Sequence, residues 1–337
     1  MKENLLGKNS AQLQELASAC GLKPFVGRQL AEWLYVKRAT SWDAMTNISR
    51  QSKAVLQERY DLGTAPPAQS AVSSDGTVKY LFRTGPSDAV EAVMIPDADR
   101  MTLCVSSQAG CRMGCRFCMT GRQGWHGNLT VSQILNQFVS IPEARSLTNA
   151  VFMGMGEPLD NYDAVSSAID ILTGEFGWSP KRITLSTIGV LPVLRRFLDS
   201  GRCHLAVSLH NPFPDERLEF MPVQKAWPLG DVIDLIRQYD FSGQRRVSFE
   251  YTMFDGWNDS KRHADALARL LRGLECRVNL IRFHAIPDFP YRCSPLPRME
   301  EFKNRLNTHG PICTIRASRG EDILAACGML AGEHTQR

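Results

Sequence analysis

Three cysteines crowd into one short stretch of the sequence. Cys111, Cys115 and Cys118 stand in the run Cys-Arg-Met-Gly-Cys-Arg-Phe-Cys, at spacings of four and three residues. A single loop of this length can wrap three thiolates around one iron–sulfur cluster, and thiolates are the ligands that such clusters select. Three protein ligands for a four-iron cube leave one iron open, so the motif predicts a cluster that can chelate a further molecule.

Zinc is the alternative for these thiols, with Cys104 or His126 as the fourth ligand. Zinc sites usually pair their cysteines on two separate knuckles, which fits three cysteines within eight residues poorly. The chain has ten cysteines in all. A chain of this length needs no disulfide framework, so the number of cysteines favours metal ligands or reactive thiols. The sequence assigns no chemistry to five of them, namely Cys20, Cys203, Cys276, Cys293 and Cys313.

Further polar groups fall where predicted strands end. The first set follows a strand at 150–153 and comprises a glycine for close backbone approach and a carboxylate that can hold an ammonium group: Gly156, Glu157 and Pro158. Other strand ends offer hydroxyl groups suited to a ribose, at Ser186 and at Ser208 in the segment Ser208-Leu209-His210, and the imidazole of His284 lies at the end of the sixth strand. Taken singly, each of these could instead be a turn residue, a helix cap or a buried hydrogen-bonding group.

The elements that must position these residues alternate between strand and helix. Strand-like runs are predicted at 102–107, 150–153, 182–187, 205–208, 247–251 and 278–283. Helical patterns follow them: one begins after Thr130, and the others cover 164–172, 191–198, 229–239, 262–271 and 299–306. Six βα units and a last strand at 313–316 predict a parallel sheet that is two units short of a closed barrel, with its chemistry at the carboxyl ends of the strands.

The rest of the chain divides into two smaller parts. Residues 1–65 are predicted to form a helical accessory domain, with helices capped by Ser10, opened by Pro24 and covering 53–60. Residues 66–100 form a β-rich connector, and 101–330 the α/β core.

Composition places the chain among ordinary globular proteins. Of its 337 residues, 43% are hydrophobic and 22% charged, which excludes a disordered or collagen-like chain. No long apolar run or signal-peptide pattern is found, so we expect a cytoplasmic protein with no membrane partner. The net charge of +4 allows a local basic face but does not establish a nucleic-acid partner.

The cysteine run matches the signature motif of the radical S-adenosylmethionine superfamily. Over nearly the whole chain the sequence also resembles the 23S ribosomal RNA adenine-C2 methyltransferases, the RlmN family of dual-specificity enzymes that also modify transfer RNA. The segments that carry this resemblance lie at 25–35, 90–96, 102–108, 154–161, 208–210 and 315–328. It implies a radical S-adenosylmethionine partial barrel, a [4Fe-4S] cluster on Cys111, Cys115 and Cys118, and two S-adenosylmethionine molecules per turnover.

The resemblance also assigns a mechanism. One S-adenosylmethionine methylates a C-terminal cysteine, which here is Cys327. A second is cleaved at the cluster, and the S-methyl group loses hydrogen and adds to C2 of adenine. Glu91 then stands where the family places the proton acceptor, and Cys104 where it places the thiol that resolves the adduct and leaves a disulfide. Without the family, the sequence favours a small packed residue at Cys327 and a solvent-facing carboxylate at Glu91.

For S-adenosylmethionine, the resemblance implies binding by Gly156, Glu157, Pro158, Ser186, Ser208, Leu209, His210 and His284. His284 departs from many relatives, which carry Asn there, although imidazole can donate a similar hydrogen bond.

The expected partners are 23S ribosomal RNA, transfer RNA and a flavodoxin-like or ferredoxin-like electron donor to a monomeric enzyme. Basic residues beside aromatic ones suit phosphate contact and base stacking. They are Lys23, Arg28, Trp33, Tyr35, Lys37 and Arg38 in the helical module, and Arg195, Arg196, Arg202, Arg245 and Arg246 in the core.

Two rival functions stay open at this point. One is the related adenine-C8 methyltransferase activity on ribosomal RNA, which uses the same apparatus. The other is a non-catalytic RNA-binding protein with a structural zinc ion.

Overall fold

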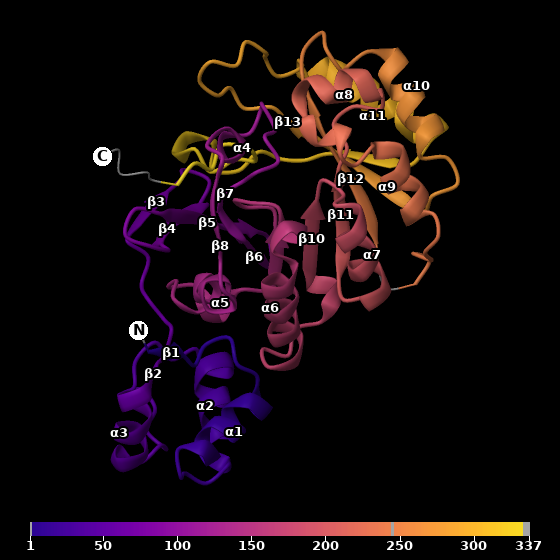
Figure 1. Cartoon of the computed structure of the whole chain (residues 1–337). Helices are drawn as coiled ribbons and strands as arrows, with labels where there is room; N and C mark the ends of the chain where they lie inside the picture. Colours follow the sequence, from indigo (N-terminus) through magenta and orange to yellow (C-terminus); the bar gives the residue numbers. More distant parts are fainter. Residues whose placement is uncertain (1, 244–245, 333–337) are drawn as a thin grey trace.

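A computed structural model describes residues 2–243 and 246–332 of the chain. Its centre is a ten-stranded sheet (Figure 1). In spatial order the strands are β14 (Ile312–Ile315), β13 (Cys276–Arg282), β12 (Val247–Met253), β11 (His204–Ser208), β10 (Ile183–Thr187), β9 (Asn149–Phe152), β6 (Arg100–Cys104), β5 (Ala89–Asp97), β4 (Val78–Arg83) and β3 (Gln69–Val72). Within this sheet, β6, β9, β10, β11, β12, β13 and β14 pair in parallel. This pairing confirms the predicted six βα units and final strand of a partial barrel.

Helices connect the parallel strands and cover the sheet (Figure 1). They are α5 (Val131–Val139), α6 (Tyr162–Gly174), α7 (Leu191–Ser200), α8 (Pro214–Phe220), α9 (Leu229–Ile236), α10 (Lys261–Leu270) and α11 (Leu296–His309). As predicted, α5 begins after Thr130. Thr130 caps the helix, accepting a hydrogen bond from the Gln133 backbone while the Gln133 side chain accepts one from the Thr130 backbone. Short 3₁₀ turns lie between these elements: η2 (Ala144–Ser146), η3 (Pro158–Asn161), η4 (Pro180–Arg182), η5 (Pro222–Lys225) and η6 (Glu321–Ile323).

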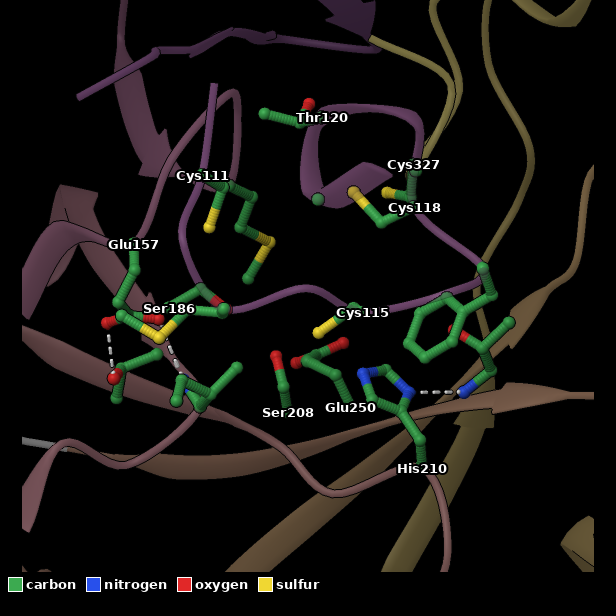
Figure 2. Close-up of a pocket in the computed structure, with 18 of the residues that line it drawn as sticks. Cys111, Cys115, Cys118, Thr120, Glu157, Ser186, Ser208, His210, Glu250 and Cys327 are labelled. Carbon is green, nitrogen blue, oxygen red and sulfur yellow. Dashed lines mark hydrogen bonds between the residues drawn. The ribbon is translucent and has the colours of Figure 1, made fainter. Parts of the chain in front are cut away.

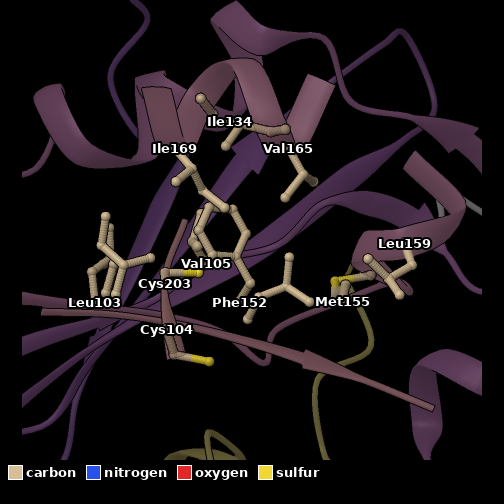
Figure 3. Close-up of a cluster of buried hydrophobic side chains, with 14 of the residues drawn as sticks. Leu103, Cys104, Val105, Ile134, Phe152, Met155, Leu159, Val165, Ile169 and Cys203 are labelled. Atoms are coloured by element: carbon tan, nitrogen blue, oxygen red, sulfur yellow. The ribbon is translucent and has the colours of Figure 1, made fainter. Parts of the chain in front are cut away.

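Helix packing buries a dense apolar layer against the sheet. Figure 3 shows Phe152 of β9 beneath Ile134 of α5 and Val165 of α6, and all three side chains are buried. Burying side chains of this size stabilises a fold by about 1.5–3 kcal/mol each. The strand ends that carry the polar residues therefore project from a rigid layer.

Residues 66–100 do more than connect two parts. Their strands β3, β4 and β5 are antiparallel, and β5 pairs with β6 through contacts such as Val93 opposite Cys104. The stretch thus extends the main sheet at one edge. A small hairpin of β7 (Gln108–Gly110) and β8 (Trp125–Asn128) also encloses the cysteine loop and the short helix α4 (Met119–Arg122), a feature the sequence analysis did not predict.

The N-terminal residues form a helical module at one end of the molecule (Figure 1). It contains β1 (Glu3–Asn4), α1 (Ser10–Ala19), α2 (Phe25–Ala31), the π-helical turn η1 (Glu32–Val36), α3 (Arg50–Arg59) and β2 (Tyr60–Asp61), with β1 and β2 paired in parallel.

Two predicted helix starts in this module are wrong. Asn9, not Ser10, caps α1, because only Asn9 places Gln12 at the third helical position for a reciprocal capping box. The third helix begins at Arg50, capped by Ser49, and not at Lys53. Pro24 does stand at the cap position of α2.

Candidate active site

The three cysteines line a cavity of about 160 Å³ at the carboxyl ends of the parallel strands (Figure 2). The loop between β7 and α4 carries them over the sheet. The structure brings six of the predicted cofactor-binding residues to the same cavity: Gly156, Glu157, Pro158, Ser186, Ser208 and His210. Cys327 also lines it, whereas Glu91, Cys104 and His284 do not.

The cysteine side chains are free thiols in a water-poor setting. Burial raises the pKa of Cys115 to about 12 and also raises the pKa of Cys111 and Cys118. Thiolate ligands must lose their protons, so a positively charged metal centre would supply the charge that stabilises three thiolates here. Among the described residues, no three histidine, cysteine or carboxylate groups converge on one point as a single metal ion requires. The zinc alternative through Cys104 or His126 therefore gains no support.

The turn after β9 approaches the cysteine hairpin closely. Gly156 has φ +95°, and a Cβ there would lie 2.5 Å from the Cβ of Gln108. The Met155 carbonyl accepts hydrogen bonds from the backbone of Ser107 and Gln108, and the Gln108 side chain accepts one from the Glu157 backbone. Both the backbone conformation and the contact require glycine at position 156.

Glu157 is held with its carboxylate toward the cavity. Its Oε1 accepts hydrogen bonds from the Thr187 hydroxyl (2.6 Å) and the Leu159 backbone (3.0 Å), and Oε2 accepts one from the Ile188 backbone (3.0 Å). These bonds occupy three of about four lone-pair sites, so one remains for a donor such as an ammonium group. Burial raises the pKa of Glu157 to about 7, and the three bonds oppose that rise.

His210 is a neutral hydrogen-bonding group. Its Nδ1 accepts a hydrogen bond from the Thr252 backbone at 2.9 Å, which leaves the proton on Nε2. Burial, helped by the nearby Arg217 charge, lowers its pKa to about 3. Its left-handed backbone (φ +58°) is fixed by Asn258, which donates to the His210 carbonyl. Leu209 has a fully buried side chain and is fixed through its backbone, which donates to Glu250.

Glu250 is a cavity residue that the sequence analysis missed. It lies on β12, lines the cavity close to Ser208 and Cys115 in Figure 2, and its Oε1 accepts hydrogen bonds from Ser248 and Asn279. Burial raises its pKa. A carboxylate inside the apolar run of β12 was the available signal, since acidic side chains are rarely buried without a reason.

Cys327 stands where two cavities meet. A second cavity of about 580 Å³ adjoins the first and shares Cys118, Glu250 and Cys327 with it. It reaches the opposite, amino-terminal ends of β9, β10 and β11. Cys327 is exposed, and Figure 2 shows its sulfur at the same end of the first cavity as that of Cys118.

Side chains from distant elements tie down the segment around Cys327. Before it, Asp322 accepts a hydrogen bond from Ser73, and Asp75 accepts one from the Gly320 backbone. After it, the Gly328 carbonyl accepts a hydrogen bond from the Met119 backbone. The Cys327 thiol is thereby positioned by residues near β3 and by α4.

Cys104 lies on the second cavity with Cys327. It is buried at the end of β6, and burial together with the neighbouring Cys327 thiol raises its pKa to about 12. The structure thus brings the two thiols predicted to react with one another to one space.

Glu91 is not a solvent-facing strand residue. It is 7% exposed, and its Oε1 forms an ion pair with Lys79 at 2.9 Å. Its Oε2 accepts hydrogen bonds from the backbones of Ala331 (2.8 Å) and Gly332 (3.2 Å), just after Cys327. In this arrangement the carboxylate anchors the C-terminal segment.

His284 also lies outside the cysteine cavity. It lines the larger one, where Nε2 is 3.1 Å from the Ser318 hydroxyl and Nδ1 is 3.3 Å from a Glu321 oxygen. The structure therefore places it beside the C-terminal segment, apart from the other predicted cofactor-binding residues.

The predicted RNA-binding residues lie in different environments, some buried, some paired and some exposed. Tyr35 is 1% exposed and packs on Phe176, so the prediction that its ring stacks on an RNA base is wrong. Arg38 packs on the same ring, and burial lowers its pKa to about 10. Arg196 and Arg202 pair with Asp163 and Asp170, and Arg245 lies outside the described residues. Lys23, Arg28 and Arg195 are exposed, Lys37 lies over Trp33, and Arg246 lines the larger cavity.

Comparisons with known proteins identify the family of both the core and the N-terminal module. The Radical SAM superfamily model matches residues 105–267, and a ribosomal RNA large subunit methyltransferase N-terminal domain matches residues 3–62. A crystal structure of a radical SAM methyltransferase from Sphaerobacter thermophilus superimposes with a TM-score of 0.94 at 40% identity, covering 98% of this chain and 100% of that one. Fold and site together define a radical S-adenosylmethionine enzyme.

Curated relatives are similar over almost their full length. Two probable dual-specificity RNA methyltransferases RlmN, from Parabacteroides distasonis and Porphyromonas gingivalis, are 57% and 59% identical to this chain. These matches cover 98% and 97% of this chain and 97% and 96% of the relatives. A dual-specificity RNA methyltransferase RlmN from Syntrophus aciditrophicus is 40% identical to this chain, and the match covers 98% of this chain and 97% of that relative. The chain belongs to the RlmN family of dual-specificity RNA methyltransferases.

Membership settles the cofactors as a [4Fe-4S] cluster and S-adenosylmethionine, two molecules per turnover. No helix in the described residues has the length and apolar character needed to span a membrane.

Proposed function

We propose that this radical S-adenosylmethionine enzyme methylates C2 of a specific adenosine in 23S ribosomal RNA and of an anticodon-adjacent adenosine in transfer RNA, with Cys327 as the methyl carrier. The observation that carries the proposal is the position of Cys327, which opens onto the cysteine cavity on one side and onto the larger cavity on the other. A carrier must reach both the methyl donor and the target base.

The cofactor residues have separate tasks. The cluster, held by Cys111, Cys115 and Cys118, supplies the electron for reductive cleavage of S-adenosylmethionine. Glu157 holds an ammonium group with its remaining lone pair, and the Ser186 and Ser208 hydroxyls face a ribose. His210 donates from Nε2, since Nδ1 is already occupied. Cys104 resolves the adduct, because it shares the larger cavity with Cys327.

The larger cavity is suited to an RNA nucleotide. Its cationic lining residues outnumber its two acidic ones, Asp97 and Glu250, and comprise Arg100, Lys181, Arg182, Arg246, Arg282, Arg316 and Arg319. Phosphate contacts of this kind supply affinity, which offsets the cost of unstacking the target adenine.

We also propose that the N-terminal module, residues 1–65, contacts RNA through its exposed Lys23 and Arg28, which flank the exposed Phe25. Replacing both basic residues by alanine should weaken RNA binding and reduce the slope of log affinity against log salt by about two. Arg59→Ala, which removes an exposed charge from α3 of the same module, is the control.

A one-electron donor must approach the cysteine loop. The exposed Arg112 and Arg116 lie within that loop and Arg122 follows it, which supports an acidic flavodoxin-like or ferredoxin-like partner.

The test is anaerobic incubation of cluster-loaded protein with isotope-labelled S-adenosylmethionine and RNA fragments, followed by mass analysis of the nucleosides. We expect 2-methyladenosine, and 8-methyladenosine alone would assign the C8 activity instead. Cys327→Ala should abolish turnover without an adduct, Cys104→Ala should accumulate protein joined to RNA, and Cys276→Ala, outside both cavities, should behave as wild type. Colourless protein with stoichiometric zinc, or clean turnover by either site variant, would refute the proposal.

A further inference from the structure

Arg217 is a buried cation that the proposed chemistry does not use. It lies on α8 and is 1% exposed. Its guanidinium donates hydrogen bonds to the carbonyl oxygens of Leu209 (3.0 Å) and Ser208 (3.0 Å), and to Oε1 of Gln224 (2.6 Å). All three acceptors are uncharged, so these bonds orient the guanidinium without neutralising it.

The charge has no anionic partner in the described part of the chain: no carboxylate there forms an ion pair with Arg217. The two carboxylates of the cysteine cavity are committed elsewhere, Glu157 to Thr187 and the backbone and Glu250 to Ser248 and Asn279. Arginine is almost never fully buried unless paired, because desolvating an ion is costly. Residues 2–243 and 246–332 therefore supply no compensating negative charge.

The Arg217 guanidinium lies on a helix that packs beside the loop carrying Cys115. The Arg116 backbone, next to Cys115, donates a hydrogen bond at 2.9 Å to the carbonyl of Phe220, the last residue of α8. The Ser208 carbonyl accepts from Arg217, and Ser208 lines the cysteine cavity together with Cys115. These contacts place the cation between α8 and the wall of the cavity that holds the three cysteines.

We propose that Arg217 is the counter-charge of the iron–sulfur cluster and sets its reduction potential. Reduction adds one electron and transfers no atom, so the site gains one unit of negative charge in a region of low polarity. A fixed buried cation stabilises the reduced state more than the oxidised state, as charge and burial do in other iron–sulfur sites. Arg217 is in this sense a positioning residue of the electron-transfer step. The inference depends on the cluster but not on which RNA or which adenine carbon is methylated.

A purely structural role is the competing explanation, because Arg217 also braces the Ser208 and Leu209 carbonyls. Gln224→Glu separates the two roles. The glutamate is nearly isosteric, keeps an oxygen acceptor for the Arg217 guanidinium and for the Leu229 backbone, and neutralises the cation in place. Arg217→Gln removes the charge directly, and Arg217→Lys retains it. Arg305→Gln, which removes a guanidinium paired with Asp265 on a distant helix, is the matched control.

The measurement is a redox titration of anaerobically reconstituted protein, followed by electron paramagnetic resonance, without RNA and at pH 7 and 9. We expect Gln224→Glu and Arg217→Gln to lower the midpoint potential by at least 59 mV, a tenfold change for one electron. Arg217→Lys and Arg305→Gln should stay near wild type. Wild-type potentials in Gln224→Glu and Arg217→Gln at full iron content would overturn the inference. If Arg217→Gln fails to fold or to bind iron, the comparison of Gln224→Glu with Arg217→Lys decides.

Discussion

Gly156→Ala tests how tightly the turn after β9 is fitted to the cysteine hairpin. The φ of +95° costs an alanine about 1–2 kcal/mol. The new methyl group would also lie 2.5 Å from the Cβ of Gln108 and 2.8 Å from its backbone nitrogen, neither of which is the far end of a flexible side chain. Overpacking of this kind costs about 1–3 kcal/mol. We expect a total loss of about 2–5 kcal/mol, a large share of the stability of a typical domain.

The same strain should reach the cofactor, because the easiest relief is a shift of the turn that moves Glu157 away from Gln108. If about 1.4 kcal/mol of the strain is relieved in this way, affinity for S-adenosylmethionine falls about tenfold. Thermal unfolding measures the first effect, and isothermal titration of cluster-loaded protein with S-adenosylmethionine measures the second.

Gly174→Ala is the control for this substitution. Gly174 is the last residue of α6, and a Cβ there meets no atom within 4 Å. The change should be neutral or stabilising by up to about 1 kcal/mol. A Gly156→Ala protein that unfolds at the wild-type temperature and binds S-adenosylmethionine with wild-type affinity would refute the reasoning.

Two further tests use the pKa values of Glu157 and His210, and a third uses the buried hydroxyl of Tyr35. Because the pKa of Glu157 is raised from 4.5 to about 7, its contribution to stability is present below pH 4.5 and is lost as pH rises through 7. The free energy of unfolding of the cofactor-free chain should therefore fall by about 3 kcal/mol across this range, and Glu157→Gln should not show this fall. The ring of His210, with its pKa lowered to about 3, should keep its neutral NMR position down to about pH 4, and titration near pH 6.5 would contradict the burial argument. Tyr35→Phe removes a hydroxyl that donates to the Lys8 carbonyl and accepts from the Gly7 backbone, so it should cost about 1–2 kcal/mol in urea unfolding while the substituted ring keeps its contact with Phe176; no change in midpoint would contradict this.

Local signals carried the predictions that succeeded. The alternation of strand and helix, the helix start after Thr130 and the cysteine spacing each depend on a short run of neighbouring residues. The sheet order follows from them, since successive βα units place parallel strands side by side. The fold class could therefore be predicted before any tertiary contact was known.

The features that were missed depend on contacts between distant segments. The strands β7 and β8 are short, and the cysteine loop and α4 separate them along the chain, so no tight-turn signal marks the hairpin in the sequence. Arg217 stands in a charged, amphipathic helix whose pattern resembles any surface helix. Tyr35 seemed available for stacking only because Phe176, which covers it, lies far along the chain. Periodicity cannot reveal a partner more than a hundred residues away.

The antiparallel strands show how such distant contacts build the site. Asp75 follows β3, Lys79 lies on β4 and Glu91 on β5, and all three bind the segment that carries Cys327, the Lys79 ammonium reaching the Leu324 carbonyl at 3.4 Å. The Glu91 carboxylate cannot hold the Ala331 and Gly332 backbones through Oε2 and accept a proton from RNA at that same oxygen. Three contacts leave one of about four lone-pair sites free, and it lies on Oε1 beside Lys79; if Glu91 is the proton acceptor, Oε1 can take the proton while Oε2 keeps its hold on the C-terminal segment.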